Sequence, residues 1–397
     1  MSLSDTPRAN RLHIGIFGRR NSGKSSLINA LTGQEIALVS DVPGTTTDPV
    51  YKTMEIHGIG PCVFIDTAGF DDEGALGLMR VEKTKAAAEK TDIALVVISD
   101  GDFEKELSWT KTLQEKKTPV ILIVNKADTL EDPQLLADRI QTKSGLRPLI
   151  VSAKDKTGIR EIREELIRRL PEDFEAVSIT GNLVKEGDVV LLVMPQDIQA
   201  PKGRLILPQV QTLRELLDKK CIVLSATTDK LDAALSFLSS PPVLIITDSQ
   251  VFRTVFDKKP KESKLTSFSV LFANYKGDLA YFVESAAAID ALTPDSRVLI
   301  AEACTHAPLS EDIGREKLPA LLRKRIGDAL QIDIVCGADF PEDLSPYDLV
   351  IHCGACMFNR KHVLSRVDSA RTQKVPMSNY GVALAYLSGI LDQIDLD

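Results

Sequence analysis

The chain has 397 residues, of which 44% are hydrophobic and 26% charged, a composition ordinary for a folded protein of two or three domains. Its formal net charge of −8 argues against a general nucleic-acid-binding protein, which would need a basic surface to displace counterions. The apolar runs are strand-length, far short of the roughly 20 residues of a membrane span, and the N-terminus shows no signal-peptide pattern. Six scattered cysteines favour a reducing compartment over a disulfide framework. We therefore expect a cytoplasmic protein with no nucleic-acid or membrane partner.

Residues 8–172 predict a first α/β domain in which buried strands alternate with amphipathic helices. Strand-like apolar runs end at residues 17, 65, 98 and 124, and each precedes a turn and a helix-like segment. A last helix over 160–170 stops before Pro171, which makes a natural boundary. This alternation is typical of a parallel sheet.

Two further series of the same kind predict a middle α/β domain at 176–266 and a last α/β domain at 267–397. Both should contain parallel sheets, although their shared style also allows one larger sheet. The charged stretch 257–264 is expected to be a solvated loop, and the apolar run 268–272 a strand. The other expected strands are 188–193, 221–226, 242–247, 297–303, 332–336 and 348–353, and the other expected helices are 208–220, 228–240, 311–327, 361–371 and 380–391.

The segment 18-GRRNSGKSS-26 lies between a predicted strand and a predicted helix and fits the phosphate-loop pattern G-x-x-x-x-G-K-S. Its glycines let backbone N–H groups point inward, where they and the positive end of the following helix hold phosphates. Lys24 is expected to reach the β and γ phosphates, and the Ser25 hydroxyl to bind Mg²⁺. The alternative is a simple glycine turn before a helix. The residues expected to bind phosphate are Asn21, Ser22, Gly23, Lys24, Ser25 and Ser26.

Three further motifs follow strand-like runs and complete a guanine-nucleotide pattern. In 66-DTAG-69, Asp66 suits an outer position around Mg²⁺, and the Gly69 N–H suits the γ-phosphate. In 125-NKAD-128, the Asp128 carboxylate can accept hydrogen bonds from the N1–H and the amine of guanine, a donor pair that adenine lacks. Each motif is weak alone, but their order and context are specific. The third motif, 152-SAK-154, is expected to support the base with Ser152, Ala153 and Lys154, and Asn125 and Lys126 are expected there as well.

With these motifs, residues 8–172 resemble the translation-factor-like group of small GTPases, which includes tRNA-modifying and ribosome-assembly GTPases. The resemblance implies that 44-GTTTD-48 is the first switch, with Thr46 as the ligand of Mg²⁺ and the γ-phosphate. That group usually has Gly-Thr-Thr-Arg-Asp here. Because Thr47 replaces the arginine, the register stays open between Thr45, Thr46 and Thr47.

Phe70 stands where many GTPases have a glutamine that orients the attacking water. Phenylalanine has no polar group for this task, so we expect slow intrinsic hydrolysis. GTPases of the resembled group that carry Asn at the position of Asn21, and lack an arginine finger, often bind K⁺ beside the phosphates, where charge assists the leaving group. The alternative is that Asn21 only satisfies the loop backbone. Catalysis is therefore assigned to Lys24, Thr46 and Asn21.

Two cysteine motifs near the end of the chain come directly after strand-like runs. They are Cys-Thr-His at 304–306 and His-Cys-Gly-Ala-Cys at 352–356. Because the carboxyl ends of parallel strands lie on one edge of a sheet, their thiols are expected to converge. The residues concerned are Cys304, His306, His352, Cys353 and Cys356.

These residues fit three kinds of site. One is a structural Zn²⁺ held by three cysteines and His306. The second is a redox-active dithiol at a helix start. The third is an iron–sulfur cluster held by three cysteines, with its fourth position weakly held or open. The remaining cysteines, Cys62 and Cys221, are expected to fill the core. Cys336 also ends a strand-like run, but it lacks a partner motif and is assigned to the core as well.

A GTPase domain followed by Cys-x-His and, after a long gap, His-Cys-x-x-Cys resembles the FeFe-hydrogenase maturation GTPases, the HydF family, over essentially the whole chain. The stretch 195–211 also resembles that family's dimer-forming middle domain, so a homodimer through 176–266 is expected. The resemblance implies a 4Fe-4S cluster whose cysteine ligands are Cys304, Cys353 and Cys356. It leaves the fourth position open between His306, His352 and a carboxylate such as Asp197.

The resemblance further implies a GTP-hydrolysing scaffold that receives a di-iron unit made with radical-SAM maturases and delivers it to the hydrogenase apoprotein. GTP hydrolysis would gate partner exchange through switch movement. The implied cofactors are GTP, Mg²⁺, K⁺ and a 4Fe-4S cluster. The alternative from a different class is a GTPase with a structural zinc domain that acts in RNA modification or ribosome assembly, against which the acidic charge counts.

Overall fold

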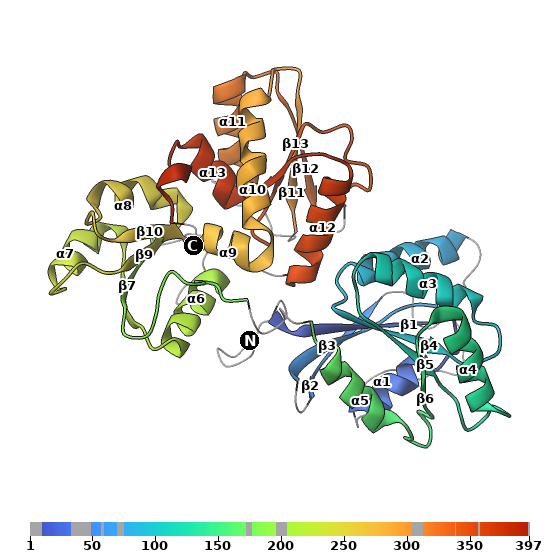
Figure 1. Ribbon diagram of the computed structural model, residues 1–397. Helices are drawn as coiled ribbons and strands as arrows, with labels where there is room; N and C mark the ends of the chain where they lie inside the picture. The colour runs from blue at the N-terminus through green and yellow to red at the C-terminus, as the bar shows by residue number, and fades with distance from the viewer. Residues whose placement is uncertain are drawn as a thin grey trace. The chain divides into compact units, whose positions relative to one another are not determined.

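A computed structural model of the chain describes residues 10–32, 49–56, 59–69, 75–171, 177–195, 205–303, 313–337, 339–355 and 358–395, with 75–80 described as backbone only. The chain forms two compact units, residues 1–176 and 177–397, and both are α/β as the alternating pattern predicted (Figure 1). Within the described ranges, no helix combines the length and apolar character that crossing a membrane requires.

The first unit is built on one six-stranded sheet. Its strands are β1 (Leu12–Phe17), β2 (Val50–Ile56), β3 (Gly60–Asp66), β4 (Ile93–Ile98), β5 (Val120–Val124) and β6 (Leu149–Ile150). In space the order is β2-β3-β1-β4-β5-β6, with β2 antiparallel to β3 and all other neighbours parallel. β1, β4 and β5 are buried along their whole length, which explains their uninterrupted apolar sequences.

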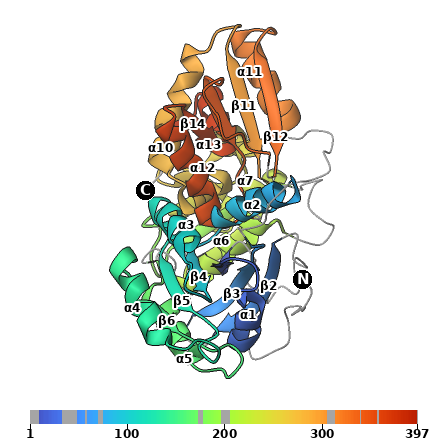
Figure 2. The same cartoon turned by 90° about the vertical axis from the view of Figure 1, so that its right-hand side faces the viewer.

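Helices cover both faces of this sheet (Figure 2). They are α1 (Lys24–Thr32), α2 (Ala75–Ala88), α3 (Glu104–Glu115), α4 (Pro133–Ser144) and α5 (Ile159–Arg168). α1 and α5 pack on one face, where Leu27 and Leu166 join the core around Ile14. α3 and α4 pack on the other, where Leu113 and Ile140 join the core around Val96. Every strand of the doubly covered sheet therefore delivers its carboxyl end to the same edge, except the antiparallel β2.

The second unit contains two separate parallel sheets of four strands each, not one larger sheet. The order β10-β9-β7-β8 uses β7 (Val189–Val193), β8 (Ile222–Ala226), β9 (Leu244–Thr247) and β10 (Lys264–Ser267). The order β12-β11-β13-β14 uses β11 (Arg297–Glu302), β12 (Gln331–Cys336), β13 (Leu349–His352) and β14 (Met377–Asn379). The helices are α6 (Leu207–Asp218), α7 (Leu231–Ser236), α8 (Phe252–Lys258), α9 (Phe268–Lys276), α10 (Leu279–Ala286), α11 (Leu318–Ile326), α12 (Arg360–Thr372) and α13 (Tyr380–Leu387).

One hydrophobic core joins the two sheets of the second unit. It contains Leu191 and Ile245 from the first sheet and Leu299 and Val350 from the second. The end of the described chain returns to β10, where the Asp395 N–H donates to the Leu265 carbonyl at 2.9 Å and the Asp395 carboxylate accepts from the Leu265 N–H at 2.8 Å. Contacts group residues 177–397 into one unit. The division between the predicted domains 176–266 and 267–397 therefore stays a prediction.

The prediction of a strand at 268–272 is wrong, because these residues begin helix α9. The Ser267 hydroxyl accepts a hydrogen bond from the Val270 N–H and so caps the helix. A short helix that is buried on nearly every side has the same unbroken apolar sequence as a buried strand. The strand of this region is β10, which together with α8 occupies part of the stretch 257–264 that was expected to be a loop.

Candidate functional site

The phosphate loop joins β1 to α1 and depends on two glycines. Gly18 has a φ of 154°, and a Cβ there would lie 2.5 Å from the Val97 carbonyl oxygen. Gly23 has a φ of 87°, and its Cβ would lie 2.3 Å from the Asn125 amide nitrogen. Any larger side chain at either position would push the loop off its neighbours.

Lys24 and Ser25 lie at the start of α1 as the loop pattern predicts. The Lys24 ammonium donates to the carbonyls of Gly18 and Arg19, both at 2.8 Å. The Ser25 hydroxyl donates to Asp66 Oδ2 at 2.8 Å. The structure thus brings the loop of β1–α1 and the end of β3 together, as a phosphate and metal site requires.

Asp66 is 4% exposed and has chemistry that fits a cation. Burial raises the pKa of its carboxyl group, and the Ser25 hydroxyl and the Lys24 ammonium partly oppose that rise. Its second oxygen, Oδ1, is buried and has no hydrogen-bond partner among the described residues. The Ser22 hydroxyl is in the same situation. A hydrated Mg²⁺ and a phosphate oxygen would supply the missing partners, so these residues fit the predicted ligands.

Asn21 is exposed and adopts a left-handed backbone conformation with a φ of 61°. The guanidinium of Arg19, two residues earlier, binds three carboxylates, two in the loop after β4 and one on α3. The distances are 2.7 Å to Asp100, 3.0 Å to Asp102 and 2.7 Å to Glu106. Glu106 is 1% exposed, and burial raises its pKa while Arg19 opposes that rise. The sequence pattern gave no sign of these partners.

The residues expected around the base also converge. The Asn125 amide donates to the Ser22 carbonyl at 3.0 Å and accepts from the Ala153 N–H at 3.2 Å, so it links the phosphate loop to the 152–154 motif. The Asp128 carboxylate accepts from the Ser152 hydroxyl at 2.8 Å. That hydrogen bond is the main cause that lowers the pKa of Asp128, and Lys154 at 3.8 Å contributes. An ionised carboxylate is what the donor pair of guanine requires.

Several predicted residues lie outside the described part of the chain. They are Thr45, Thr46, Thr47 and Phe70 of the nucleotide site, and Asp197, Cys304, His306 and Cys356 of the cysteine site. Their predicted roles therefore stay predictions.

The second site is the carboxyl edge of the sheet formed by β11 and β13. These strands are parallel neighbours with Ala301 opposite His352, and the Cys353 N–H donates to the Ala301 carbonyl at 2.9 Å. The Ala303 N–H donates to the Cys353 sulfur at 3.0 Å. The residue before Cys304 thus contacts the sulfur of Cys353. The convergence of the thiols themselves stays a prediction, because Cys304 and Cys356 lie outside the described residues. An N–H donor on the sulfur also suits a thiolate that binds iron.

His352 is fully buried and both of its ring nitrogens have partners. Nδ1 lies 2.6 Å from the Cys353 carbonyl oxygen, and Nε2 lies 2.8 Å from a guanidinium nitrogen of Arg366. Burial, with the nearby Arg366 charge, lowers the pKa of His352 to about 3, so the ring is neutral. Ligation of a metal by this residue, as the sequence suggested, would require one of these bonds to break.

Of the other described cysteines, two lie in the hydrophobic core and one lies at the edge of a sheet. Cys62 and Cys221 are buried as predicted, and burial raises the pKa of Cys62 to about 12. Cys336 was ranked as a core residue, but it is half-buried at the end of β12. Its sulfur lies 3.1 Å from the Glu302 carboxylate and 2.9 Å from Arg315. Across the described ranges, no three His, Cys, Asp or Glu side chains group as metal ligands.

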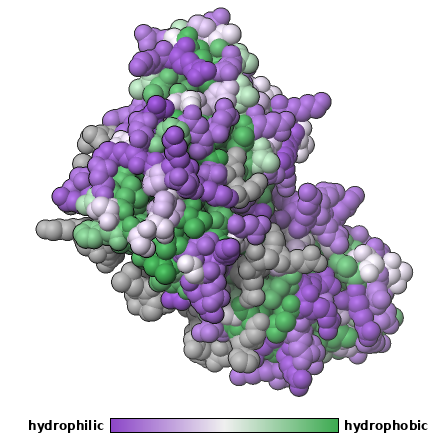
Figure 3. All heavy atoms as spheres, turned by 60° about the vertical axis from the view of Figure 1, so that its left-hand side comes forward, coloured by the Kyte–Doolittle hydropathy of each residue, from purple (hydrophilic) through white to green (hydrophobic). Residues whose placement is uncertain are grey.

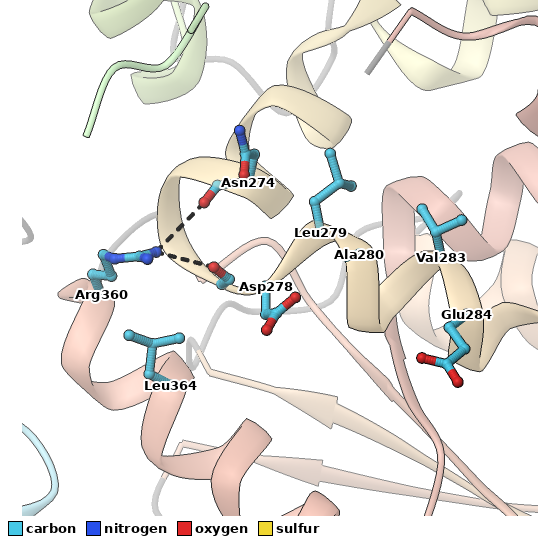
Figure 4. A pocket seen from close by; sticks show the side chains of 9 residues that line it. Asn274, Asp278, Leu279, Ala280, Val283, Glu284, Arg360 and Leu364 are labelled. Carbon is cyan, nitrogen blue, oxygen red and sulfur yellow. Dashed lines mark hydrogen bonds between the residues drawn. The ribbon is translucent and has the colours of Figure 1, made fainter. Parts of the chain in front are cut away.

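A pocket of about 620 Å³ lies where α9, α10 and α12 meet. Arg360, the first residue of α12, donates to the carbonyls of Asn274 at 3.4 Å and Gly277 at 3.0 Å (Figure 4). The helix that follows the cysteine turn is therefore anchored to the carboxyl end of α9. Asp278 on the pocket wall caps α10 and forms an ion pair with Arg371, so its carboxylate has a structural role.

Comparison with known protein families separates the two units. The family model described as "Hydrogen maturase F dimerization domain" matches residues 179–277, and that described as "Hydrogen maturase F tetramerization domain" matches residues 280–394. The model described as "50S ribosome-binding GTPase" matches residues 13–126. All three agree with the order of motifs along the chain.

Two curated relatives, both GTPases, each match about two fifths of the chain. The tRNA modification GTPase MnmE of Heliobacterium modesticaldum is 40% identical over 157 residues, which cover 39% of this chain and 33% of the relative. GTPase Era of Carboxydothermus hydrogenoformans is 33% identical over 165 residues, which cover 40% of this chain and 55% of the relative. The chain therefore spans between a third and about half of the length of these relatives. A solved structure of an Aquifex aeolicus Era variant bound to GDP and aluminium fluoride is 20% identical, with a TM-score of 0.37, and the match covers 57% of this chain and 98% of that one.

Proposed function

This chain belongs to the HydF family of hydrogenase maturation GTPases, and we propose that it is a GTP-hydrolysing scaffold that holds a 4Fe-4S cluster and delivers a di-iron unit to an FeFe-hydrogenase apoprotein. The observation that carries the proposal is the contact of the Ala303 N–H with the Cys353 sulfur. It supports a cysteine site at one sheet edge of a chain that also has a nucleotide loop. Radical-SAM maturases are the proposed source of the di-iron unit.

On the nucleotide side, Lys24 neutralises the β and γ phosphates and Ser25 binds Mg²⁺. Asp66, whose buried Oδ1 has no partner among the described residues, would help to hold the ion. Mg²⁺ would draw negative charge from the phosphate oxygens during hydrolysis. Thr46 is proposed to complete this site. Asp128 selects guanine, because its carboxylate can accept from the N1–H and the amine of guanine, and adenine lacks this donor pair.

K⁺ is proposed to supply the charge that assists the leaving group, with Asn21 as its ligand. The orientation of Arg19 supports this role, because three carboxylates hold its guanidinium. An arginine held in this way does not serve as an arginine finger without first leaving the buried Glu106 unpaired.

On the cysteine side, the thiolates of Cys304, Cys353 and Cys356 would hold the cluster. When bound, it would offer an exchangeable iron position for a bridging ligand of the di-iron unit. His306 and Asp197 stay proposals for the group that occupies this position before delivery. The protein itself orients Cys353 through hydrogen bonds to its N–H and its sulfur.

A homodimer through the middle sheet is part of the proposal. The family models name dimerization and tetramerization domains, which supports self-association. β8 is an edge strand of its sheet, and Ile222 on it is 62% exposed. Phe237 beyond α7 is 85% exposed. Figure 3, which brings the side of α7 and α8 forward, shows apolar surface interspersed with polar side chains.

The RNA-modification alternative has less support. The relatives named as tRNA modification GTPases match this chain over the nucleotide unit, 39% of its length in the first case. The rest of the chain matches models of hydrogen maturase F. A structural zinc site nevertheless remains a distinct outcome of the decisive measurement.

That measurement is anaerobic reconstitution with iron and sulfide, followed by absorption spectroscopy and analysis for iron, sulfide and zinc. The parent protein should turn brown, and the double variant Cys353→Ser/Cys356→Ser should lose most iron and sulfide while it still hydrolyses GTP. Cys221→Ser is the matched control, because that buried thiol lies in the same unit and donates only to the Lys185 carbonyl. Stoichiometric zinc without iron, or a full cluster in the double variant, would overturn the proposal.

A further inference from the structure

Arg366 is a buried cation directly behind the cysteine turn. It lies on α12 and is 3% exposed. One guanidinium nitrogen, Nη1, lies 2.8 Å from His352 Nε2, and the other, Nη2, donates to the Gly337 carbonyl at 2.6 Å. The Phe340 ring covers the guanidinium at 4.6 Å. These contacts from separate segments hold the guanidinium in one orientation.

The chemistry of arginine fixes the direction of the hydrogen bonds. A guanidinium has donors and no acceptor, so His352 Nε2 must accept from Arg366. A neutral imidazole has one N–H, which must therefore be on Nδ1. Nδ1 then donates to the Cys353 carbonyl, 2.6 Å away. The opposite tautomer would place an N–H of the ring against an N–H of Arg366.

The two hydrogen bonds that run from Arg366 through His352 end on Cys353, which forms hydrogen bonds through three of its groups. The Cys353 carbonyl accepts from His352, the Cys353 N–H donates to Ala301, and the Cys353 sulfur accepts from Ala303. Two residues later, Ala355 adopts a left-handed φ of 45°, so the chain turns sharply here. Arg360 anchors the same helix α12 that carries Arg366. The thiolate is thus oriented before any metal arrives.

We propose that His352 is a positioning residue and not a cluster ligand, and that Arg366 locks it in the Nδ1–H tautomer so that it orients Cys353. The proposal rests on the cluster assignment made above. It removes His352 from the candidates for the fourth position and leaves that position to other groups. It also gives α12 a direct mechanical connection to the cysteine turn.

Two variants of His352 separate the roles. His352→Asn keeps an N–H donor at the position of Nδ1 for the Cys353 carbonyl, whereas His352→Phe fills similar space and has no such donor. We expect the parent protein and His352→Asn to hold equal iron and to give the same EPR and nitrogen-coupling spectra of the reduced cluster. His352→Phe should lose its cluster to a chelator roughly tenfold faster, the effect of one buried hydrogen bond. A histidine nitrogen coupling that disappears in His352→Asn would show ligation and overturn the proposal.

A readout on the apoprotein separates this proposal from the cluster assignment. The chain has five histidines, so the ¹⁵N signals that vanish in His352→Asn identify His352 in a histidine-labelled sample. Those signals should show the Nδ1–H tautomer in the parent protein and in Arg366→Lys, and a shift toward Nε2–H in Arg366→Met. The Nε2–H tautomer in the parent protein would refute the lock. A parent protein with the Nδ1–H tautomer but no iron after reconstitution would leave the lock intact and defeat the proposed function instead.

Discussion

Arg19 of the phosphate loop binds the buried carboxylate of Glu106 on α3, with Nε 2.7 Å from Oε1. We predict that Arg19→Ala lowers the free energy of unfolding of the first unit by about 2 kcal/mol, because it leaves a buried carboxylate unpaired. The exposed partners Asp100 and Asp102 should contribute little. Denaturant unfolding followed by fluorescence measures this directly, since the single tryptophan, Trp109, stacks on Phe17 within the same unit.

The double variant Arg19→Ala/Glu106→Gln is the control for that prediction. Glutamine removes the unpaired charge, so the double variant should recover part of the lost stability. Asp102→Asn, which changes an exposed partner, should leave the unfolding curve nearly unchanged. Equal loss in the single and double variants would mean that the charge pair is not the cause.

Asp128 should set the base specificity of the nucleotide site. Asp128→Asn should weaken GTP binding by roughly 100-fold or more, because the amide cannot accept from both donors of guanine. The same variant should gain affinity for XTP, since xanthine carries an oxygen where guanine carries its amine and asparagine can donate to it. Fluorescent-nucleotide titration measures both. If ATP competed equally with GTP in the parent protein, the guanine assignment would be wrong.

GTP hydrolysis should rise severalfold when K⁺ replaces Na⁺ at constant ionic strength, and Asn21→Ala should remove the difference. Nucleotide affinity of the variant should stay close to that of the parent, because Lys24 and the backbone of the loop remain. Steady-state phosphate release in the two salts is the measurement. Equal parent rates in K⁺ and Na⁺ would exclude this role of the cation.

Glu215 on α6 should make the second unit sensitive to acid. Burial alone would raise its pKa, but hydrogen bonds from Thr180, Ile179 and Ser178 together lower it. A lowered pKa in the folded state means that this stabilisation is complete above the usual glutamate value of about 4.3 and is lost as the pH falls below it.

Glu215→Gln should therefore destabilise the second unit at neutral pH by about 1–3 kcal/mol and flatten the acid dependence of its unfolding. Circular dichroism at several pH values measures both effects. Glu186→Gln is the matched control, because this glutamate of the same unit forms an exposed pair with Lys220. A similar effect of both variants would show that general charge, not the buried hydrogen bonds, is responsible.

Much of the architecture could be predicted because buried parallel strands have short, unbroken apolar sequences. β1, β4 and β5 end at the predicted residues, and their carboxyl ends locate the nucleotide motifs. The same inference fails for the run at 268–272, because a short helix that is buried on most sides shows no polar residues at helical spacing and so has the same apolar sequence as a strand. The edge rule predicted that the carboxyl ends of β11 and β13 lie on one edge of a sheet, and the two strands are in fact parallel neighbours.

Contacts between distant side chains could not be predicted in this way. Nothing local to Arg19 points to Glu106, which lies 87 residues away. His352 was a candidate metal ligand because it matches a histidine in the motif of the resembled family. Its partner Arg366 appears only when α12 packs behind the turn. Cys336 was assigned to the core because it lacks a partner motif, yet its strand lies at the edge of its sheet.

The backbone pairing of Leu265 with Asp395 has a consequence for biosynthesis. Strand β10 has a partner that the ribosome makes 130 residues later, so the second unit cannot complete its folding until residue 395 has emerged. The first unit ends at residue 176, so all of it has emerged while the second unit is still being translated, and it can fold during that time. During that interval the nascent chain would carry a folded nucleotide-binding unit ahead of an unfinished one, which is when chaperones would be most needed.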